Sequence, residues 1–393
     1  MTHIVRSLVT LLAVIVAAGC TTLGEHATLP TKLPPVRYEE VTFGELPGWS
    51  DALLTPSLRA FLAGCPKLAH SLERVCQSAQ LASQGDERVA REFFESAFTP
   101  YAVISAHDSR EGLVTGYYEP ILAASRARGG AYQSPVLGVP RDLLIVDLGS
   151  VYPELANLRL RGRLEGRRVV PYYSRAEIVA EGQNSASNGS ATPVIAWVAD
   201  PVELFFLQIQ GSGQLVLDNG ERIRVGYAEQ NGHPYRSLGR HLVDRGEMPL
   251  DRASMQGIKA WAGANPGKLQ DALNHNASYV FFRELPVEGG PFGALGVPLS
   301  AEYSVAVDRG YIPLGAPVFL ATTYPNSEQP LRRLMAAQDT GGAIRGALRA
   351  DFYWGAGEDA GALAGRMRQR GRMWILWPRG ELLPKRLVEA SRG

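Results

Sequence analysis

The sequence has almost no excess of charge of either sign: among 393 residues, 40 Lys and Arg face 39 Asp and Glu. This balance excludes a bulk electrostatic attraction to nucleic acid or to an anionic membrane surface. Long charged runs and internal repeats of about 20–50 residues are also missing, which excludes a solenoid. Hydrophobic residues make up 45% and charged residues 20%, the balance of a globular protein.

Cysteine and histidine are scarce. Only three cysteines and seven histidines occur, and none has C-x-x-C or H-E-x-x-H spacing. We therefore expect no metal site and no cofactor. In an oxidising compartment Cys65 and Cys76 are expected to form a disulfide, and two buried free thiols are the alternative.

An apolar run long enough to span a membrane is missing too. The run from Leu8 to Ala18 is shorter than the ~20 residues that cross a bilayer, and it ends at small residues and Cys20. This pattern resembles a bacterial lipoprotein signal. We predict that residues 1–19 are removed, that Cys20 is lipidated and that residues 20–45 are a Pro-rich tether. By resemblance to lipoprotein sorting, Thr21 instead of Asp after the cysteine implies the periplasmic face of the outer membrane. A plain secretory signal is the alternative.

Glycine and proline are abundant, with 42 and 26 residues, which favours many short strands joined by turns. Apolar periodicity predicts helices within 50–98 and near 234–245 and 254–275. Short β-branched runs predict strands at 112–118, 169–173, 194–198, 204–210, 279–282, 303–307, 316–321, 331–338 and 373–377. The predicted fold class is α+β, mostly β with N-terminal helices.

Three aspartates stand in turn-rich segments of the C-terminal third. Asp308 lies in AVDRGYIPLG, Asp339 in AAQDTGGAIRG and Asp351 in ADFYWG. Each has an alternative role as a turn-forming residue beside glycine. Asp351 is followed directly by Phe-Tyr-Trp, and burial among such neighbours raises a carboxyl pKa into the range of a general acid.

Aromatic and amide side chains suggest a sugar-binding site. In Phe206–Gly213, strand alternation would place Gln208, Gln210 and Ser212 on one face, which fits either a ligand groove or an exposed edge. Aromatic residues could stack on sugar rings, with ordinary core packing as the alternative. The candidate substrate-binding residues are Tyr117, Tyr118, Gln208, Gln210, Ser212 and Tyr353.

Taken together, the motifs VTGYYEP, FFLQIQGSG, VGYAEQNGHPYRSLG and the three-aspartate region resemble the membrane-bound lytic murein transglycosylase A (MltA) family, with a C-terminal "3D" domain. The resemblance covers residues 100–380. It implies a double-psi β-barrel built from residues 46–119 and 285–393. A second, barrel-like β-domain of residues 120–284 would be inserted into it, with a glycan groove between the two.

The resemblance also implies a reaction. The substrate would be peptidoglycan, cut between N-acetylmuramic acid and N-acetylglucosamine with a 1,6-anhydro end as product. The family's catalytic acid and base corresponds to Asp351, and Asp339 and Asp308 take supporting roles. Glycan strands, the outer membrane through the lipid anchor and other cell-wall enzymes are the expected partners of a monomer, and nucleic acid is not.

Three other functions are compatible with parts of the pattern. Asp339-Thr340-Gly341 is also the triplet of aspartic proteases, but no second triplet occurs. A non-catalytic peptidoglycan-binding lipoprotein would keep the aromatic residues without needing the aspartates. A hydrolytic muramidase would need a second carboxylate, for which Glu119, Glu358 and Asp359 are available.

Overall fold

A computed structural model describes residues 35–68, 73–152, 155, 160–184 and 192–383. Cys20 and the predicted signal segment 1–19 lie outside the described residues. Within the described ranges, no helix has the length and apolar character needed to cross a bilayer.

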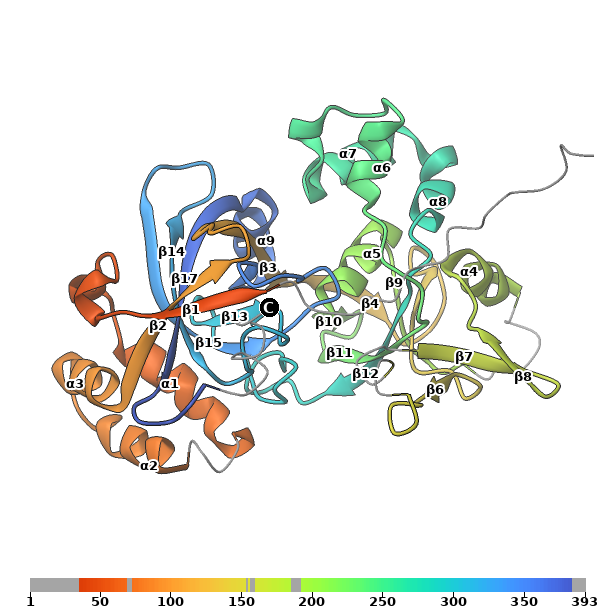
Figure 1. Cartoon of the computed structure of the whole chain (residues 1–393). Coiled ribbons are helices and arrows are strands. Elements are labelled where there is room, and N and C mark those ends of the chain that lie inside the picture. The colour runs from red at the N-terminus through yellow and green to blue at the C-terminus, as the bar shows by residue number, and fades with distance from the viewer. Residues whose placement is uncertain (1–34, 69–72, 153–154, 156–159, 185–191, 384–393) are drawn as a thin grey trace, which may run out of the picture. The chain divides into compact units, whose positions relative to one another are not determined.

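Helices occur in two groups along the chain, within residues 55–97 and 175–274, and α9 stands apart from both (Figure 1). The first group is α1 (Thr55–Gly64), α2 (Glu73–Ala82) and α3 (Glu87–Ala97). The others are α4 (Arg175–Asn184), α5 (Pro201–Gln210), α6 (Leu238–Asp244), α7 (Met255–Ala264), α8 (Pro266–Asn274) and α9 (Gly357–Arg366). The helix expected over 254–275 is therefore two helices, because α7 ends before Asn265 and α8 starts at Pro266.

The described strands form three sheets. The eight-stranded sheet contains β1 (Val36–Glu40), β2 (Phe98–Ser105), β3 (Gly112–Glu119), β13 (Ser304–Val307), β14 (Pro317–Thr323), β15 (Pro330–Asp339), β16 (Ala350–Ala356) and β17 (Arg368–Pro378). The six-stranded sheet contains β4 (Ile121–Ser125), β5 (Ser134–Leu137), β9 (Val194–Val198), β10 (Ser212–Leu217), β11 (Arg222–Gln230) and β12 (Val280–Leu285). The three-stranded sheet contains β6 (Leu144–Val146), β7 (Leu160–Glu165) and β8 (Arg168–Pro171).

The largest sheet closes on itself. β17 pairs with β14 and also with β3, so the order β17-β14-β15-β13-β16-β3 forms a ring. Alternate residues of these strands pack into one apolar core, which includes Val305, Val318, Phe352 and Ile375. The alternating pattern of the sequence thus produces a barrel with a filled interior. The expected α+β class, mostly strands with helices, is confirmed.

Gly116 is required for packing on this barrel. A Cβ at Gly116 would lie 2.6 Å from Trp354 Nε1 and 2.9 Å from the Ala364 Cα in α9. Only glycine allows α9 to approach β3 this closely, which explains the glycine in the VTGYYEP motif.

The first three helices cover the outer face of the barrel. The apolar contact is made by three phenylalanines, Phe61, Phe94 and Phe98, which pack with Phe319 of β14 and Leu376 of β17. In both strands, side chains alternate between this outer face and the barrel interior. The structure joins Cys65 to Cys76 by a disulfide, with the Cα atoms 5.8 Å apart. The disulfide links the end of α1 to α2, and the apolar contacts hold these helices against the barrel strands.

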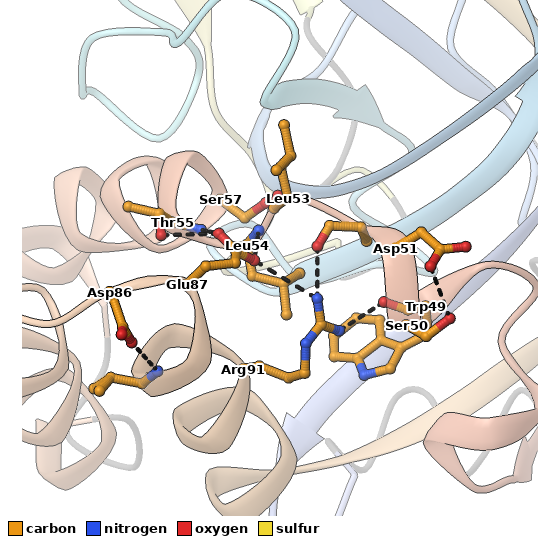
Figure 2. A network of polar contacts seen from close by, with 12 residues as sticks. Trp49, Ser50, Asp51, Leu53, Leu54, Thr55, Ser57, Asp86, Glu87 and Arg91 are labelled. Carbon is orange, nitrogen blue, oxygen red and sulfur yellow. Dashed lines mark hydrogen bonds and ion pairs between the residues drawn. The ribbon is translucent and has the colours of Figure 1, made fainter.

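A polar network ties α1 to α3 (Figure 2). The Glu87 carboxylate accepts hydrogen bonds from Leu54 N at 2.6 Å, from Thr55 N at 3.0 Å and from Thr55 Oγ1 at 2.9 Å. The first amides of α1 are therefore satisfied by a residue of another helix, whose negative charge also suits the positive end of the helix dipole. Arg91 donates to Trp49 O and Ala52 O and holds the preceding turn.

Replacing Glu87 should destabilise the protein. Glu87→Ala leaves the amides of Leu54 and Thr55 without their acceptor, and we expect a loss of about 1–2 kcal/mol in the free energy of unfolding. Urea denaturation followed by circular dichroism measures it. Glu92→Ala on the same helix is the matched control, because its exposed ion pair with Arg88 contributes under about 0.5 kcal/mol. Equal effects of the two substitutions would contradict the capping role.

The strand predicted over 204–210 is wrong, because these residues belong to α5. Asp200 caps that helix by accepting hydrogen bonds from Val202 N and Glu203 N, and Pro201 opens it. Gly211 ends it with a φ of 77°. These capping residues decide in favour of a helix over the apparent alternation of FFLQIQ.

Candidate active site

Four neighbouring strands of the barrel place the candidate catalytic residues in one row. Asp351 on β16 is in register with Thr115 on β3 and with Ala306 on β13. Ala306 is in turn in register with Asp339 on β15. Adjacent strands lie about 4.8 Å apart, so the two aspartates are separated by one strand that carries a small side chain.

A β-bulge brings Asp339 into this row. Val305 pairs with Ala337, whereas Ala306 pairs with Asp339, so Gln338 is the extra residue. Ala337 packs in the barrel core, and without the bulge Asp339 would face that core as well. Gln338 is fully buried and holds the bulge: it accepts a hydrogen bond from Ser304 Oγ and donates to Ala60 O of α1.

Asp351 has the properties of a general acid. Its carboxylate accepts a 2.5 Å hydrogen bond from Thr115 Oγ1, and part of the side chain remains accessible. Burial raises the pKa of Asp351 to about 6, against the opposing effects of the Thr115 hydrogen bond and the Arg349 charge. Asp339 nearby raises it further. A carboxyl group with such a pKa can both give and take a proton near neutral pH.

Arg349 orients the Thr115 hydroxyl, which contacts Asp351. Its Nη2 donates to Thr115 Oγ1 over 2.7 Å, and its Nη1 donates to Ala350 O. Since the Thr115 oxygen accepts from Arg349, its own proton is directed to Asp351. Burial lowers the pKa of Arg349, and the charge of Asp351 raises it.

Asp339 is anchored by the backbone. Its Oδ1 accepts hydrogen bonds of 2.9 Å from Ala294 N and from Thr340 N. Burial raises the pKa of Asp339, and these two bonds oppose the rise. The Tyr117 hydroxyl lies nearby: burial and then the charges of Asp339 and Asp351 raise the pKa of Tyr117. That hydroxyl is buried against Asp339, and its interaction with the Asp339 carboxylate also opposes the rise of the Asp339 pKa.

Two of the predicted aromatic residues belong to this site. The rings of Tyr117 and Tyr353 lie 5.1 Å apart, and both pack with Ala306. Both are buried, so they form a wall of the site more than an open stacking platform. Tyr118 points to the opposite face of β3, where its hydroxyl contacts Met255 Sδ.

Asp308 has a different position from the other two aspartates. Its Oδ1 accepts a hydrogen bond from Gly310 N at 3.0 Å, and its Oδ2 accepts one from Gly346 N at 2.8 Å. Each carboxylate oxygen therefore holds one backbone turn in place, and the turn at Gly346 leads into β16.

The polar residues predicted from FFLQIQGSG do not share a face, because a helix ends between them. Gln208 is buried, while Gln210 accepts a hydrogen bond from Tyr118 N. Ser212 starts β10 and is half-buried. Ile209, which an alternating strand would bury, is 40% exposed.

Glu119 at the end of β3 is held by an ion pair. Its carboxylate lies 2.7 Å from Arg224 Nε, and both side chains are at most 5% exposed. Gln214 Nε2 donates to the same carboxylate at 2.9 Å. Glu358 and Asp359, the other candidate second carboxylates, are exposed in the first turn of α9.

Two family models match the chain: the MltA specific insert domain over residues 113–283 and the 3D domain over residues 303–377. Membrane-bound lytic murein transglycosylase A of Escherichia coli K12 is 32% identical over 321 residues, which are 79% of this chain and 78% of that protein. The chain belongs to the MltA family. By family it is thus a lytic transglycosylase, and the resemblance expected from its motifs is confirmed.

Solved structures of the MltA family have the same fold. The crystal structure of MltA from Neisseria gonorrhoeae matches with a TM-score of 0.77 and 40% identity, over 90% of this chain and 98% of that one. The structure of E. coli MltA with bound chitohexaose matches with a TM-score of 0.63 and 27% identity, over 88% and 95% of the two chains.

Sequence reasoning missed Thr115 and Arg349. A signal existed for both, because strand alternation puts Thr115 on the face of Tyr117 and Arg349 on the face of Asp351. Within the described part of the chain, no group of three His, Cys, Asp or Glu side chains is arranged to hold a metal ion.

Proposed function

We propose that this protein cleaves peptidoglycan glycan strands at the β-1,4 bond between N-acetylmuramic acid and N-acetylglucosamine, with 1,6-anhydromuramic acid ends as product. The observation that carries the proposal is Asp351, a partly accessible carboxyl with a pKa of about 6 in a member of the MltA family. The E. coli relative with bound chitohexaose supports a glycan of N-acetylated sugars as substrate.

One carboxyl group is enough for this reaction. Protonated Asp351 gives its proton to the glycosidic oxygen as the bond to C1 breaks. The resulting carboxylate then takes the proton of the C6 hydroxyl as that oxygen attacks C1. Asp351 is thereby returned to its protonated form, and no water is consumed.

The neighbouring residues support Asp351 in this scheme. Asp339, held by two amides, stabilises positive charge at the anomeric carbon. The Tyr117 hydroxyl is buried beside Asp339, and the rings of Tyr117 and Tyr353 form the adjoining wall. Asp308 keeps the preceding turns in place. Ser212 remains a predicted substrate contact.

The alternatives have less support. A hydrolytic muramidase needs a second carboxylate to activate water or attack C1. Glu119 is paired with Arg224, and Glu358 and Asp359 are exposed on α9. A non-catalytic binder has no use for a carboxyl whose pKa is raised by burial at an accessible position.

Product analysis tests the function. We expect mass spectrometry of muropeptides, after incubation of purified sacculi with the protein, to show anhydro ends. Reducing ends would show a hydrolase, and release of no fragment would show a binder. Either result would contradict the proposal.

The pH dependence should follow Asp351. Because the acid must start protonated and burial raises its pKa to about 6, kcat/KM should be flat below that pH and fall about tenfold per unit above it. Thr115→Val removes a hydrogen bond that lowers this pKa, so the falling limb should move to higher pH. Thr322→Val on β14, which loses a hydrogen bond to Arg370 O, is the control and should leave the limb in place. If Thr115→Val leaves the falling limb at the same pH, Asp351 is excluded as the titrating acid.

For the domain organisation, we propose a double-psi barrel of residues 46–119 and 285–393, an inserted domain of residues 120–284 and a glycan groove between them. Within the predicted tether of residues 20–45, β1 (Val36–Glu40) already pairs with β2, so the sheet begins earlier than the proposed barrel bounds. For localisation, we propose diacylation of Cys20 and attachment to the periplasmic face of the outer membrane. The membrane-bound relatives support an anchor. Other cell-wall enzymes remain proposed partners of a monomer.

A further inference from the structure

A cavity of about 100 Å³ lies in the region matched by the MltA specific insert domain. Its walls come from α4, α5, α8 and strands β5 and β9, and they include none of the residues in the row around Asp351. The walls are mostly apolar, with Leu137, Ile178, Leu204 and Leu273 among them. A cavity of this volume has room for a small organic group of several non-hydrogen atoms.

A buried arginine lines this cavity. Arg175 on α4 is only 5% exposed. Its Nε donates to Asn276 O at 2.9 Å and its Nη2 to Ser278 O at 2.6 Å. Its guanidinium lies 4.8 Å from the ring of Phe205 and 5.0 Å from that of Tyr279. The group is thus fixed in position by two carbonyls and two aromatic rings.

The charge of Arg175 has no counter-ion. Among the residues that the structure describes, no carboxylate pairs with Arg175 or with Arg128 at the cavity. Arg175 lines the cavity, and its Nη1 donates to none of the described residues. Burial lowers the pKa of Arg175 to about 10, and only tyrosines oppose the fall. Because buried cations are normally paired with an anion, Arg175 is suited to bind an anionic ligand.

The surroundings favour a carboxylate with a short aliphatic group. Arg128 and Gln133, which hydrogen-bond to each other, and Gln270 supply polar groups at exposed positions of the lining. Gln208, one turn beyond Leu204 and Phe205 on α5, has a buried amide that interacts with Tyr279 of the lining. The apolar walls suit a methyl group, and the planar guanidinium suits a carboxylate.

We propose that this cavity is a binding site for a small carboxylate, such as the C-terminal residue of a short peptide, with Arg175 as its anchor. The existence of the site is inferred from its own residues. The identity of its ligand as the peptide carried by the glycan strand rests on the proposed function.

NMR titration of the purified protein with N-acetyl-D-alanine tests the site. We expect binding with a Kd near ~1 mM, as suits a ligand of this size. N-acetyl-D-alaninamide, which has no carboxylate, and inorganic phosphate, which has no aliphatic group, should bind at least about tenfold more weakly. Arg175→Lys keeps the charge but loses the fork of donors, and should weaken binding about tenfold or more.

Two further variants make the test decisive. Ile178→Phe fills the cavity and should abolish binding, whereas Arg126→Gln changes an exposed, neighbouring charge outside the lining and should not. Circular dichroism melting shows whether each variant is folded.

No binding to the wild type at roughly 10 mM, or equal binding to a folded Ile178→Phe variant, would overturn the site. The titration measures binding and not cleavage. Its outcome is therefore independent of whether the sacculus assay shows the anhydro product.

Discussion

Asp351→Asn should abolish glycan cleavage while leaving the fold intact. A general acid or base contributes roughly 10²–10⁴-fold, and more is expected when one group carries both proton transfers. Asn keeps the size of the side chain and still accepts the hydrogen bond from Thr115. We expect no detectable anhydro product from sacculi over the same period in which the wild type completes the reaction. A variant that retains more than about a tenth of the rate would exclude Asp351, and Asp339 would be the next candidate.

The same variant should be more stable than the wild type at neutral pH. Because the pKa of Asp351 in the folded protein, about 6, is above its usual 3.8, folding disfavours the charged form. Stability that this group contributes at low pH is lost as pH rises from about 4 to 6. Asn carries no charge, so the variant should gain roughly 2–3 kcal/mol at pH 7 and close to nothing at pH 4. Urea unfolding at both pH values separates loss of chemistry from loss of structure. Asp339→Asn should reduce activity less than Asp351→Asn does, because Asp339 transfers no proton in the proposed reaction.

Arg224→Met should destabilise the protein more strongly than Glu87→Ala. The Glu119–Arg224 pair is almost fully buried and joins the end of β3 to β11 of the second sheet. Without the guanidinium, the Glu119 carboxylate loses its counter-ion, although Gln214 still donates to it. Removal of one partner of a buried pair costs about 3–5 kcal/mol, which urea unfolding would measure. Arg222→Met, exposed two residues earlier on β11, is the control and should change stability by under about 0.5 kcal/mol.

A double-mutant cycle shows whether the cost comes from the unpaired charge. Glu119→Gln combined with Arg224→Met leaves no buried charge, and the double variant should recover a large part of the loss. Additive effects would show that the two residues do not interact. Glu119→Gln by itself should still cleave glycan, because Glu119 has no proton-transfer role in the proposed reaction. An inactive but folded Glu119→Gln variant would favour the muramidase.

Much of the local structure is predictable from the sequence, and the exceptions have a common cause. The apolar pattern of residues 50–98 predicts helices, and α1, α2 and α3 lie there. The strand expected over 204–210 is wrong because FFLQIQ alternates like a strand within a helix. Asp200, Pro201 and Gly211 are the capping signals that outweigh this alternation. A six-residue alternation is weak evidence, since a helix end stabilised by hydrogen bonds to its caps competes with it directly.

The sequence by itself determined the chemistry: the aspartates, the aromatic residues beside them and the family motifs are properties of short segments. The tertiary structure alone decided which of them meet. Thr115 and Asp351 are 236 positions apart in sequence, yet share a hydrogen bond because β3 and β16 pair in register. The bulge at Gln338 turns Asp339 out of the barrel core, and Ser304 and α1 hold it there. Strand pairing and register depend on contacts between distant segments, so no local pattern encodes them, and a shift of one residue would send Asp339 to the opposite face.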